Sequence, residues 1–451
     1  MTCPKAGLNV SFSAQYIYDF RGEADMAKNT DIRYRNQLLY AVFVRDYGKN
    51  GTFKDVEEDL DRIRSLGTDI IWFMPIHPIG KIGRKGSVGS PYAISDYRAV
   101  NPDFGTMEDF IRLTDEIHKR GMRCIIDVVY NHTSPDSVLS AEHPEWFYRD
   151  ENGMPKAKVK EWWDIVDLDF NNQGLWDYLV KTLCFWAKYV DGFRCDVAAF
   201  VPLDFWKRAR ESVEEVRPGA FWLAESVEMD YVRRIRGAGE SCLSDSELYQ
   251  VFDACYDYDV FDELSDYLLG KGPLEKYLDR INMQECIYPG NYIKLHFSEN
   301  HDQARTAALV PDLYNRRHLL AFMMFLKGIS FLYNGQERSA AAFSNIFERE
   351  PIDWTGPDLS DVIVKMKKVK ESEILAAGSF FAEEVRKGVV RAVYTRGQER
   401  LTGLFAIGSG PVGADTGLPD GLYRNEYNGE EIYVFHGAVP VGEDPVIIGC
   451  L

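Results

Sequence analysis

The sequence predicts an α/β fold built on a (β/α)8 TIM barrel, and two features of the chain carry this prediction. From Leu38 onward, short apolar runs alternate with polar turns and stretches of helical period, which is the pattern of successive βα units in a parallel sheet. Eight such runs occur before about residue 376, and eight parallel strands, each followed by a helix, close naturally into a barrel. An open doubly wound sheet fits the same pattern and stays the alternative.

The eight apolar runs are expected to form the barrel strands in chain order. They are residues 39–44, 69–74, 124–129, 192–196, 221–224, 251–254, 293–297 and 329–333. The amphipathic segments between them are expected to be helices, among them 56–66, 107–120, 203–216 and 315–326. The longest apolar stretch, 319–333, is interrupted by Lys327 and Gly328, so it predicts a buried helix and a strand rather than a membrane span.

Three further segments accompany the barrel, which is expected over residues 38–375. Residues 1–37 are polar and mixed and are expected to form an N-terminal arm. Residues 131–171 lack a clear period and are expected to form a short subdomain, inserted after the third strand at the barrel rim. After about Ala376, alternating apolar residues and Gly-rich turns predict a small C-terminal antiparallel β domain over 376–451.

The composition limits the classes of partner and the compartment. A net charge of -18 argues against nucleic acid or an anionic membrane as a partner and suits a neutral substrate. The first residues contain no apolar stretch of the signal-peptide type. Eight cysteines are scattered without metal-ligand spacing, which favours free thiols in a reducing compartment. These observations favour the cytoplasm and leave the oligomeric state open.

The stretch from Gly192 to Ala198 contains Arg194 and Asp196, two residues apart at the end of an apolar run. On a strand, side chains at this spacing point to the same face. An Asp beside an obligate cation is expected to stay ionised, because the neighbouring charge lowers its pKa. Such a carboxylate can act as a nucleophile or as an electrostatic stabiliser, although an isolated pair of this kind is more often structural.

Polar residues also follow other apolar runs at their carboxyl ends, where barrel enzymes place their chemistry. The third run continues to His132, the fifth ends at Glu225, and the seventh leads to His301 and Asp302. The carboxylates of Asp196, Glu225 and Asp302 therefore follow different strands and are expected to converge on one mouth of the barrel. Together they indicate an active site based on carboxylates.

These segments resemble the α-amylase family of glycoside hydrolases over roughly residues 38–357. The four conserved regions of that family are matched, in order, by Asp127-Val-Val-Tyr-Asn-His132, Gly192-Phe-Arg-Cys-Asp196, Glu225 and Phe297-Ser-Glu-Asn-His-Asp302. Segments 90–97, 100–106 and 333–337 add supporting matches. The joint match in this order is very specific, whereas any single motif is weak.

The resemblance implies a role for each matched residue. Asp196 matches the nucleophile that attacks the anomeric carbon, and Glu225 matches the general acid that later activates water. Asp302 matches the third carboxylate, which binds sugar hydroxyls and favours the oxocarbenium-like state. Two carboxyl groups used in this way give a covalent glycosyl-enzyme and net retention. The implied substrate-binding residues are Tyr92, the aromatic platform, and His132, Arg194, His301, Asp96 and Arg305.

Two departures from the family pattern bear on substrate and cofactor. Ala199 and Phe200 stand where starch-cleaving members often carry Lys-His, which leaves specificity for long-chain starch in doubt. The short rim insertion, together with the lack of a signal-type stretch, favours short, soluble oligosaccharides. Asn131 matches a position that binds calcium in many amylases, but one amide is not a calcium site. No cofactor is expected to be required, and calcium stays open.

The resemblance thus implies a retaining hydrolase of α-1,4-linked maltooligosaccharides, with an oligosaccharide as its partner. A 4-α-glucanotransferase, in which an acceptor sugar replaces water, or an α-1,6-glucosidase would carry the same triad. A non-catalytic sugar-binding barrel is the least favoured interpretation, because such relatives usually lose members of the triad. Trp162 and Trp163 in the inserted segment either stack on sugars or pack that subdomain.

Overall fold

The computed structural model describes residues 29–159 and 161–450, and it confirms the predicted barrel. The parallel strands close in the order β1-β10-β9-β8-β7-β6-β3-β2, which excludes the open doubly wound sheet. Of the expected N-terminal arm, residues 1–28 lie outside the described residues. The barrel strands are β1 (Leu38–Val42), β2 (Ile70–Phe73), β3 (Arg123–Val128), β6 (Gly192–Cys195), β7 (Phe221–Ala224), β8 (Ala254–Tyr256), β9 (Lys294–His296) and β10 (Gly328–Tyr333).

The barrel strands are short and buried on both faces, which is why they appear in the sequence as continuous apolar runs. Every residue of β1, β2, β6 and β7 is buried. Gly192 at the start of β6 shows how closely the strands approach each other. A Cβ atom at this position would lie 2.1 Å from the carbonyl oxygen of Phe221 in β7, so only glycine fits.

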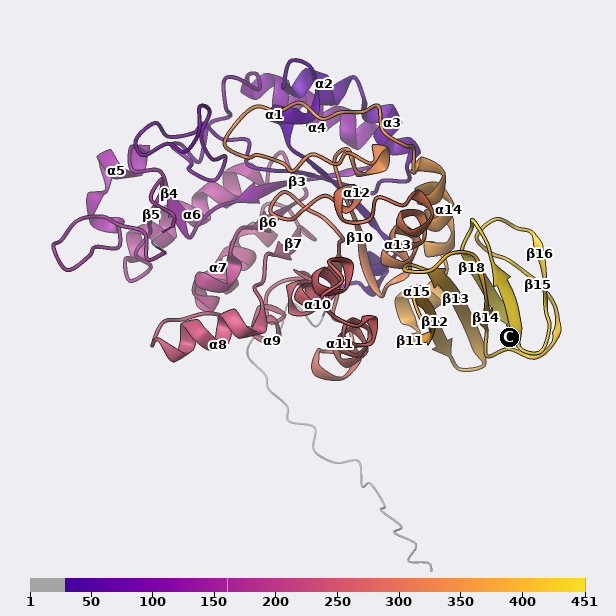
Figure 1. Ribbon diagram of the computed structural model, residues 1–451. Coiled ribbons are helices and arrows are strands. Elements are labelled where there is room, and N and C mark those ends of the chain that lie inside the picture. Colours follow the sequence, from indigo (N-terminus) through magenta and orange to yellow (C-terminus); the bar gives the residue numbers. More distant parts are fainter. Residues whose placement is uncertain (1–28, 160, 451) are drawn as a thin grey trace, which may run out of the picture.

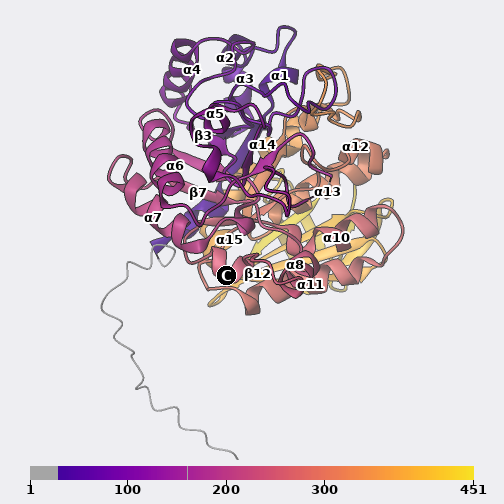
Figure 2. The same cartoon turned by 90° about the vertical axis from the view of Figure 1, so that its left-hand side faces the viewer.

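Helices surround the ring of strands, as the two views of the molecule show (Figures 1 and 2). In α4, the hydroxyl of Thr106 accepts the N–H of Asp109, whose carboxylate accepts the N–H of Thr106 in return, so a capping box starts this helix. The helices of the barrel are α1 (Val44–Tyr47), α2 (Phe53–Glu57), α3 (Leu60–Ser65), α4 (Met107–Lys119), α6 (Gln173–Trp186), α7 (Leu203–Glu214), α8 (Met229–Gly237), α9 (Asp245–Leu248), α10 (Tyr258–Leu268), α11 (Leu274–Ile287), α12 (Thr306–Leu309), α13 (Leu313–Phe325), α14 (Ser360–Lys370) and α15 (Glu373–Ala377).

Two predicted elements differ more from the observed ones than the others, whose bounds shift by at most two residues. The sixth strand is not at 251–254 but at Ala254–Tyr256, because Asp253 belongs to the turn before it. There its carboxylate accepts the N–H of Trp222 and pairs with Arg210. The helix predicted over 56–66 is divided into α2 and α3 at Asp59, whose carboxylate binds Arg62 and the hydroxyl of Tyr47.

The segment inserted after β3 and the C-terminal strands lie on opposite sides of the barrel (Figure 1). The insertion contains β4 (His132–Thr133), α5 (Val138–Glu142), the 3-10 turn η3 (Pro144–Trp146) and β5 (Val166–Asp167), and β4 pairs antiparallel with β5. The C-terminal strands form a four-stranded antiparallel sheet and two separate two-stranded antiparallel sheets, which confirms the predicted β domain. They are β11 (Ser379–Arg386), β12 (Val389–Arg396), β13 (Glu399–Ala406), β14 (Val412–Asp415), β15 (Gly421–Arg424), β16 (Glu431–Val434), β17 (Ala438–Val441) and β18 (Val446–Cys450).

Arg35 connects the beginning of the barrel to two later segments. It lies in the 3-10 helix η2 (Ile32–Asn36), directly before β1, and its side chain is buried. Its guanidinium donates to the carbonyl oxygens of Tyr292, Gly290 and Ala376 at distances between 2.6 and 3.0 Å. The short helix η2 directly before the first strand is thus part of the folded barrel, which the polar character of this segment did not reveal.

We expect Arg35→Met to lower the free energy of unfolding by about 3 kcal/mol, because the carbonyl oxygens of two buried residues, Tyr292 and Ala376, lose a charged donor. Urea denaturation would measure this loss, and the activity of the folded fraction should stay unchanged. Arg33→Met is the matched control, since Arg33 is exposed and pairs with Asp31 two residues away. Equal stability of the Arg35 and Arg33 variants would contradict the connecting role of Arg35.

Candidate active site

Three carboxylates meet in one cavity at the carboxyl ends of the barrel strands. Asp196 follows β6, Glu225 follows β7, and Asp302 lies in the loop after β9. All three line a cavity of about 330 Å³. A parallel barrel brings the carboxyl ends of its strands to one face, so residues far apart in the sequence become neighbours here.

The guanidinium of Arg194 lies between these carboxylates and is fully buried, with 0% of its side chain exposed. Nη1 donates to both oxygens of Asp127, at 2.9 and 3.0 Å, and to Oδ1 of Asp196 at 2.8 Å. Nη2 lies 2.9 Å from Oε1 of Glu225, and Nε donates to the hydroxyl of Tyr256 at 3.2 Å. Two neighbouring amino groups of one side chain therefore hold Asp196 and Glu225, while Asp127 fixes the guanidinium itself.

Burial gives Asp196 and Glu225 unusual pKa values. It raises the pKa of Glu225 to about 7 against the attraction of Arg194, and the negative charges of Asp196 and Asp302 add to this effect. Burial also raises the pKa of Asp196 to about 6, again opposed by Arg194. The prediction that Arg194 lowers the pKa of Asp196 below its usual value is therefore wrong. Because three carboxylates share one guanidinium, its attraction lowers their pKa values by less than their burial raises them.

Asp302 is shifted in the opposite direction by its contact with His301. Burial acts to raise the pKa of Asp302, but His301 lowers it below its usual value through its Nε2, which lies 3.1 Å from Oδ2 of Asp302. Burial disfavours the charged form of His301, yet Asp302 raises the pKa of that imidazole. Asp302 is therefore the most acidic of the three candidate catalytic groups.

Three of the predicted substrate-binding residues line the cavity: Tyr92, His132 and His301. The hydroxyl of Tyr92 lies 2.7 Å from Nε2 of His301, and the two rings are nearly parallel, with an interplanar angle of 18°. Burial lowers the pKa of His132 to about 4, so its ring is neutral at pH 7. Arg194 holds the carboxylates as described above.

The other two predicted substrate-binding residues do not line the cavity. The carboxylate of Asp96 accepts the backbone N–H of Arg98 at 2.8 Å, which closes a local turn. Arg305 is buried, and its Nη1 donates to Oε1 of Glu299 at 2.8 Å and to the carbonyl of Asn334 at 3.1 Å. Arg305 thus stabilises the loop that carries His301 and Asp302 without lining the cavity.

Val197, directly after Asp196, has a backbone conformation that β-branched residues rarely adopt. Its φ is +35°, in the left-handed region. In this conformation its N–H donates to Oε2 of Glu225 at 2.7 Å, while Arg194 holds the other oxygen. The turn therefore fixes the position of Glu225, and no residue preference in the sequence announces it.

Four further residues line the cavity that no motif in the sequence marks: Lys85, Asp164, Ile346 and Phe347. They come from three loops that lie far apart in the sequence. Neither spacing nor periodicity marks them. The only signal in the sequence was the Gly-rich basic composition around Lys85, which is also typical of an exposed loop.

The surroundings of Asn131 do not form a calcium site by themselves. Its Nδ2 lies 3.4 Å from Oδ1 of Asp167 and 3.3 Å from Nδ1 of His132. Calcium takes six to eight oxygen ligands, and this pair offers one amide oxygen and one carboxylate. Within residues 29–159 and 161–450, no three or more His, Cys, Asp or Glu side chains are grouped to hold a metal.

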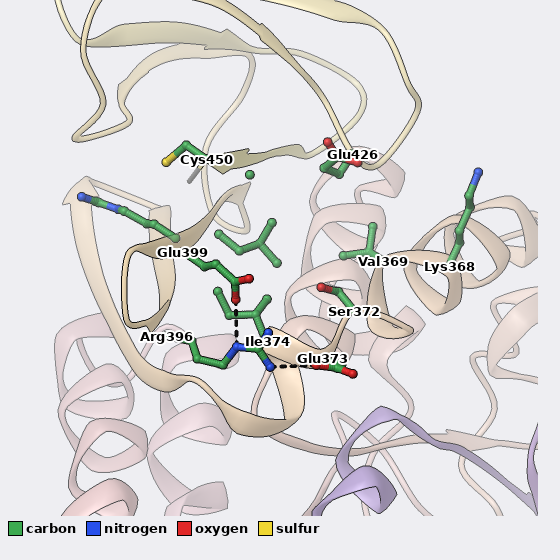
Figure 3. Close-up of a pocket in the computed structure, with 12 residues that line it drawn as sticks. Lys368, Val369, Ser372, Glu373, Ile374, Arg396, Glu399, Glu426 and Cys450 are labelled. Carbon is green, nitrogen blue, oxygen red and sulfur yellow. Dashed lines mark hydrogen bonds and ion pairs between the residues drawn. The ribbon is translucent and has the colours of Figure 1, made fainter.

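A larger cavity, of about 590 Å³, lies between α14, α15 and the C-terminal sheet (Figure 3). Three of its charged groups pair with each other: Arg396 donates to Glu399 at 2.8 Å and to Glu373 at 2.9 Å. Ile374 and Leu401 contribute apolar surface to it. The smaller cavity is the candidate active site, because carboxylates from the ends of three different strands converge only there among the two.

Comparison with known proteins identifies both parts of the chain. The family model described as the alpha amylase catalytic domain matches residues 24–379, and that of the bacterial alpha amylase C-terminal domain matches residues 381–448. The crystal structure of an alpha-amylase from Lactobacillus plantarum is 42% identical, with a TM-score of 0.90, and the match covers 93% of this chain and 100% of that one.

Other relatives carry different activities in their names. A noncanonic maltogenic alpha-amylase from Thermotoga neapolitana is 32% identical with a TM-score of 0.81, over 92% of this chain and 99% of that one. An alpha-1,4-glucan:maltose-1-phosphate maltosyltransferase from Rhodospirillum rubrum is 27% identical over 72% of this chain and 48% of its own length. The match to alpha-amylase 2 from Dictyoglomus thermophilum covers 64% of that protein. The chain thus spans about half to two thirds of these two curated relatives.

Proposed function

Because this chain belongs to the α-amylase family of glycoside hydrolases, we propose that it hydrolyses α-1,4 bonds of maltooligosaccharides with retention of the anomeric configuration. The carboxylate set carries the proposal: Asp196, Glu225 and Asp302 line one cavity, and one guanidinium contacts the first two. Retaining glycosidases hold two carboxyl groups about 5 Å apart. A shared guanidinium supports so short a separation.

In the first step of the proposed mechanism, the carboxylate of Asp196 attacks the anomeric carbon while Glu225 protonates the oxygen of the leaving sugar. The glycosidic bond breaks, and an ester bond forms between the sugar and Asp196. In the second step, the Glu225 carboxylate accepts a proton from water, and the water oxygen displaces Asp196. The proton gained returns Glu225 to its acidic form, so the cycle is balanced.

The surrounding groups support this division of roles. Glu225 has the higher pKa of the pair and therefore carries the proton more readily near neutral pH. Asp302 stays ionised beside His301, and its negative charge stabilises the positive charge that develops on the sugar ring. Tyr92 offers a flat aromatic surface against the same sugar.

We expect kcat/KM for maltoheptaose to follow a bell-shaped pH profile with its optimum between about pH 6 and 7. Falling pH protonates Asp196, whose pKa burial raises to about 6, and so removes the nucleophile. Rising pH deprotonates Glu225, whose pKa burial raises to about 7, and so removes the acid. Because Asp196 and Glu225 interact, the two apparent pKa values of the profile belong to the pair and not to either residue alone. Initial rates in buffers of constant ionic strength would test this, and activity that keeps increasing past about pH 8 would contradict it.

The substrate is tested by incubating the purified protein with maltoheptaose, isomaltotriose and panose and separating the products over time. The proposal predicts shorter maltooligosaccharides from maltoheptaose and no cleavage of isomaltotriose. Cleavage confined to the two sugars with α-1,6 bonds would assign the enzyme to the α-1,6-glucosidases instead.

A 4-α-glucanotransferase is the second candidate, and the maltosyltransferase names among the curated relatives favour it. In a transferase, the hydroxyl of an acceptor sugar replaces water in the second step. The same product analysis separates the two activities, because only transfer makes oligosaccharides longer than maltoheptaose.

We place the enzyme in the cytoplasm as part of the proposal. The seven cysteines in the described part of the chain are all free thiols, which suits a reducing compartment. Over the same residues, no helix combines the length and the apolar character that crossing a bilayer requires. Fractionation of source cells with an antibody against the chain would test the location.

A further inference from the structure

An ion pair forms part of the wall of the active-site cavity. Nζ of Lys85, in the loop after β2, lies 2.8 Å from Oδ1 of Asp164 in the inserted segment, and both residues line the cavity. Only 15% of the lysine side chain and 4% of the aspartate side chain are exposed. The neighbouring Ile82 and Arg84 are exposed, so Lys85 is turned inward from an otherwise solvated loop. Burying a charge pair gains little stability, which makes a role in binding the better explanation.

In addition to this ion pair, Lys85 makes further contacts that join the loop after β2 to the inserted segment. Its Nζ donates to the carbonyl oxygen of Glu161 at 2.9 Å and lies 4.4 Å from the ring centroid of Trp163. The same ammonium lies 5.6 Å from the ring centroid of Phe347, which follows β10. One lysine thus contacts two other segments at the cavity wall.

Further hydrogen bonds close the seam between the loop after β2 and the loop after β10. The carbonyl oxygen of Phe347 accepts the N–H groups of Val88 and Gly89, each at 3.2 Å. The carboxylate of Glu348 accepts the N–H of Ser87 at 2.9 Å. The loop after β2, the inserted segment and the loop after β10 therefore form one continuous wall.

The wall stands beside the residues assigned to the sugar that Asp196 attacks. Ile165, next to Asp164, packs with Ala93, the neighbour of the Tyr92 platform. Trp162 approaches the His132 ring with a centroid distance of 5.7 Å. In the proposed mechanism, the leaving sugar is the one that Glu225 protonates. The wall therefore faces the part of the substrate that stays bound to Asp196. It limits how many sugars this part can extend toward the non-reducing end.

The ion pair has the chemistry to recognise the end of a sugar chain. An ammonium has three donors, and among the described residues Lys85 uses two of them, on Asp164 and Glu161. The remaining donor, which lies among the rings of Trp163 and Phe347, and the second carboxylate oxygen of Asp164 suit the free hydroxyl groups of a terminal glucosyl unit. An internal glucosyl unit carries the next glycosidic bond in place of one of these hydroxyls. A buried polar site built for a hydroxyl rejects ligands that lack it.

We infer that Lys85 and Asp164 close the cavity and bind the hydroxyl groups of the terminal non-reducing sugar, so that this enzyme cleaves from chain ends. The inference rests on the proposed function, because the roles proposed for Asp196 and Glu225 decide which side of the cleaved bond faces the wall. It makes the enzyme exo-acting, with short products released from the non-reducing end.

The test compares maltoheptaose with the same heptasaccharide whose terminal non-reducing sugar is blocked by a 4,6-ethylidene group. Wild-type protein should cleave the blocked sugar at least about 100-fold more slowly. Lys85→Ala, which opens the wall, should bring the two rates within about tenfold of each other by the same reasoning. Lys158→Ala is the matched control: Lys158 pairs with Glu240 at 3.1 Å and lies over the Tyr148 ring, but it does not line the cavity. This control should keep the wild-type ratio.

Equal rates of wild-type protein on both sugars would overturn the inference while leaving the proposed hydrolase intact. An unchanged ratio in Lys85→Ala would also overturn it. If wild-type protein cleaves neither sugar, calorimetric binding of maltotriose and ethylidene-blocked maltotriose decides. Tighter binding of the unblocked sugar would support the wall and reject the hydrolase, whereas equal binding or no binding of either would reject both.

Discussion

Asp196→Asn should lower kcat on maltoheptaose by at least about 10⁴-fold, because an amide cannot form the ester intermediate. The substitution keeps the shape of the side chain, and the amide oxygen can still accept from Nη1 of Arg194, which now donates to Oδ1 at 2.8 Å. The fold and maltotriose binding should therefore be retained. Product release measured at high enzyme concentration, together with calorimetric binding, would separate loss of chemistry from loss of affinity.

Asp177→Asn is a matched control for this variant. Asp177 forms an exposed pair with Arg208 on the outer helices, away from the cavity. Its substitution should leave kcat unchanged. Turnover by the Asp196 variant above about 1% of wild type would reject Asp196 as the nucleophile, since the loss would then match a positioning effect rather than removal of the attacking group.

Glu225→Gln should lower kcat on maltoheptaose by about 10²–10⁴-fold, which is the usual contribution of a general acid and base. Fluoride leaves without a proton, so α-maltosyl fluoride should still react rapidly in the first step. The second step needs Glu225 as a base, and the glycosyl-enzyme should therefore accumulate. Mass spectrometry of the protein after reaction with the fluoride would detect the added sugar, and peptide mapping should locate it on Asp196.

The pH profile gives a second measurement on the same variant. Loss of Glu225 should remove the alkaline limb that its raised pKa produces and leave the acid limb of Asp196. Glu228→Gln is the control, because Glu228 lies nearby in the sequence but does not line the cavity. Equal loss of rate on maltoheptaose and on the fluoride, with no accumulated intermediate, would reject Glu225 as the acid.

Much of the fold could be predicted because parallel barrel strands are buried on both faces. Their apolar runs mark β3, β7 and β10 to within one residue at each end. The prediction failed where a polar side chain serves the backbone locally. Asp253 holds Arg210 and the N–H of Trp222 before β8, which moves that strand toward the C-terminus. Arg35 is buried on carbonyl groups of distant segments, and nothing in its own neighbourhood in the sequence indicates that.

The site could be predicted only as far as its motifs extend. Asp196, Glu225 and Asp302 follow strands whose ends must meet, so their convergence follows from topology. The contact between Lys85 and Asp164 joins two loops whose paths depend on tertiary packing, so no pattern announces it. The pKa of Asp196 was predicted in the wrong direction because the sequence shows its cationic neighbour but not its burial.

Proton NMR of maltoheptaose hydrolysis in its first minutes tests the central claim, that Asp196 and Glu225 run a retaining double displacement. Two successive inversions at the anomeric carbon return the α configuration. The α-anomeric signal of the new reducing end should therefore appear first, and the β signal should grow later by mutarotation. A β signal that appears first would mean a single inversion by water, and it would contradict the glycosyl-enzyme on Asp196.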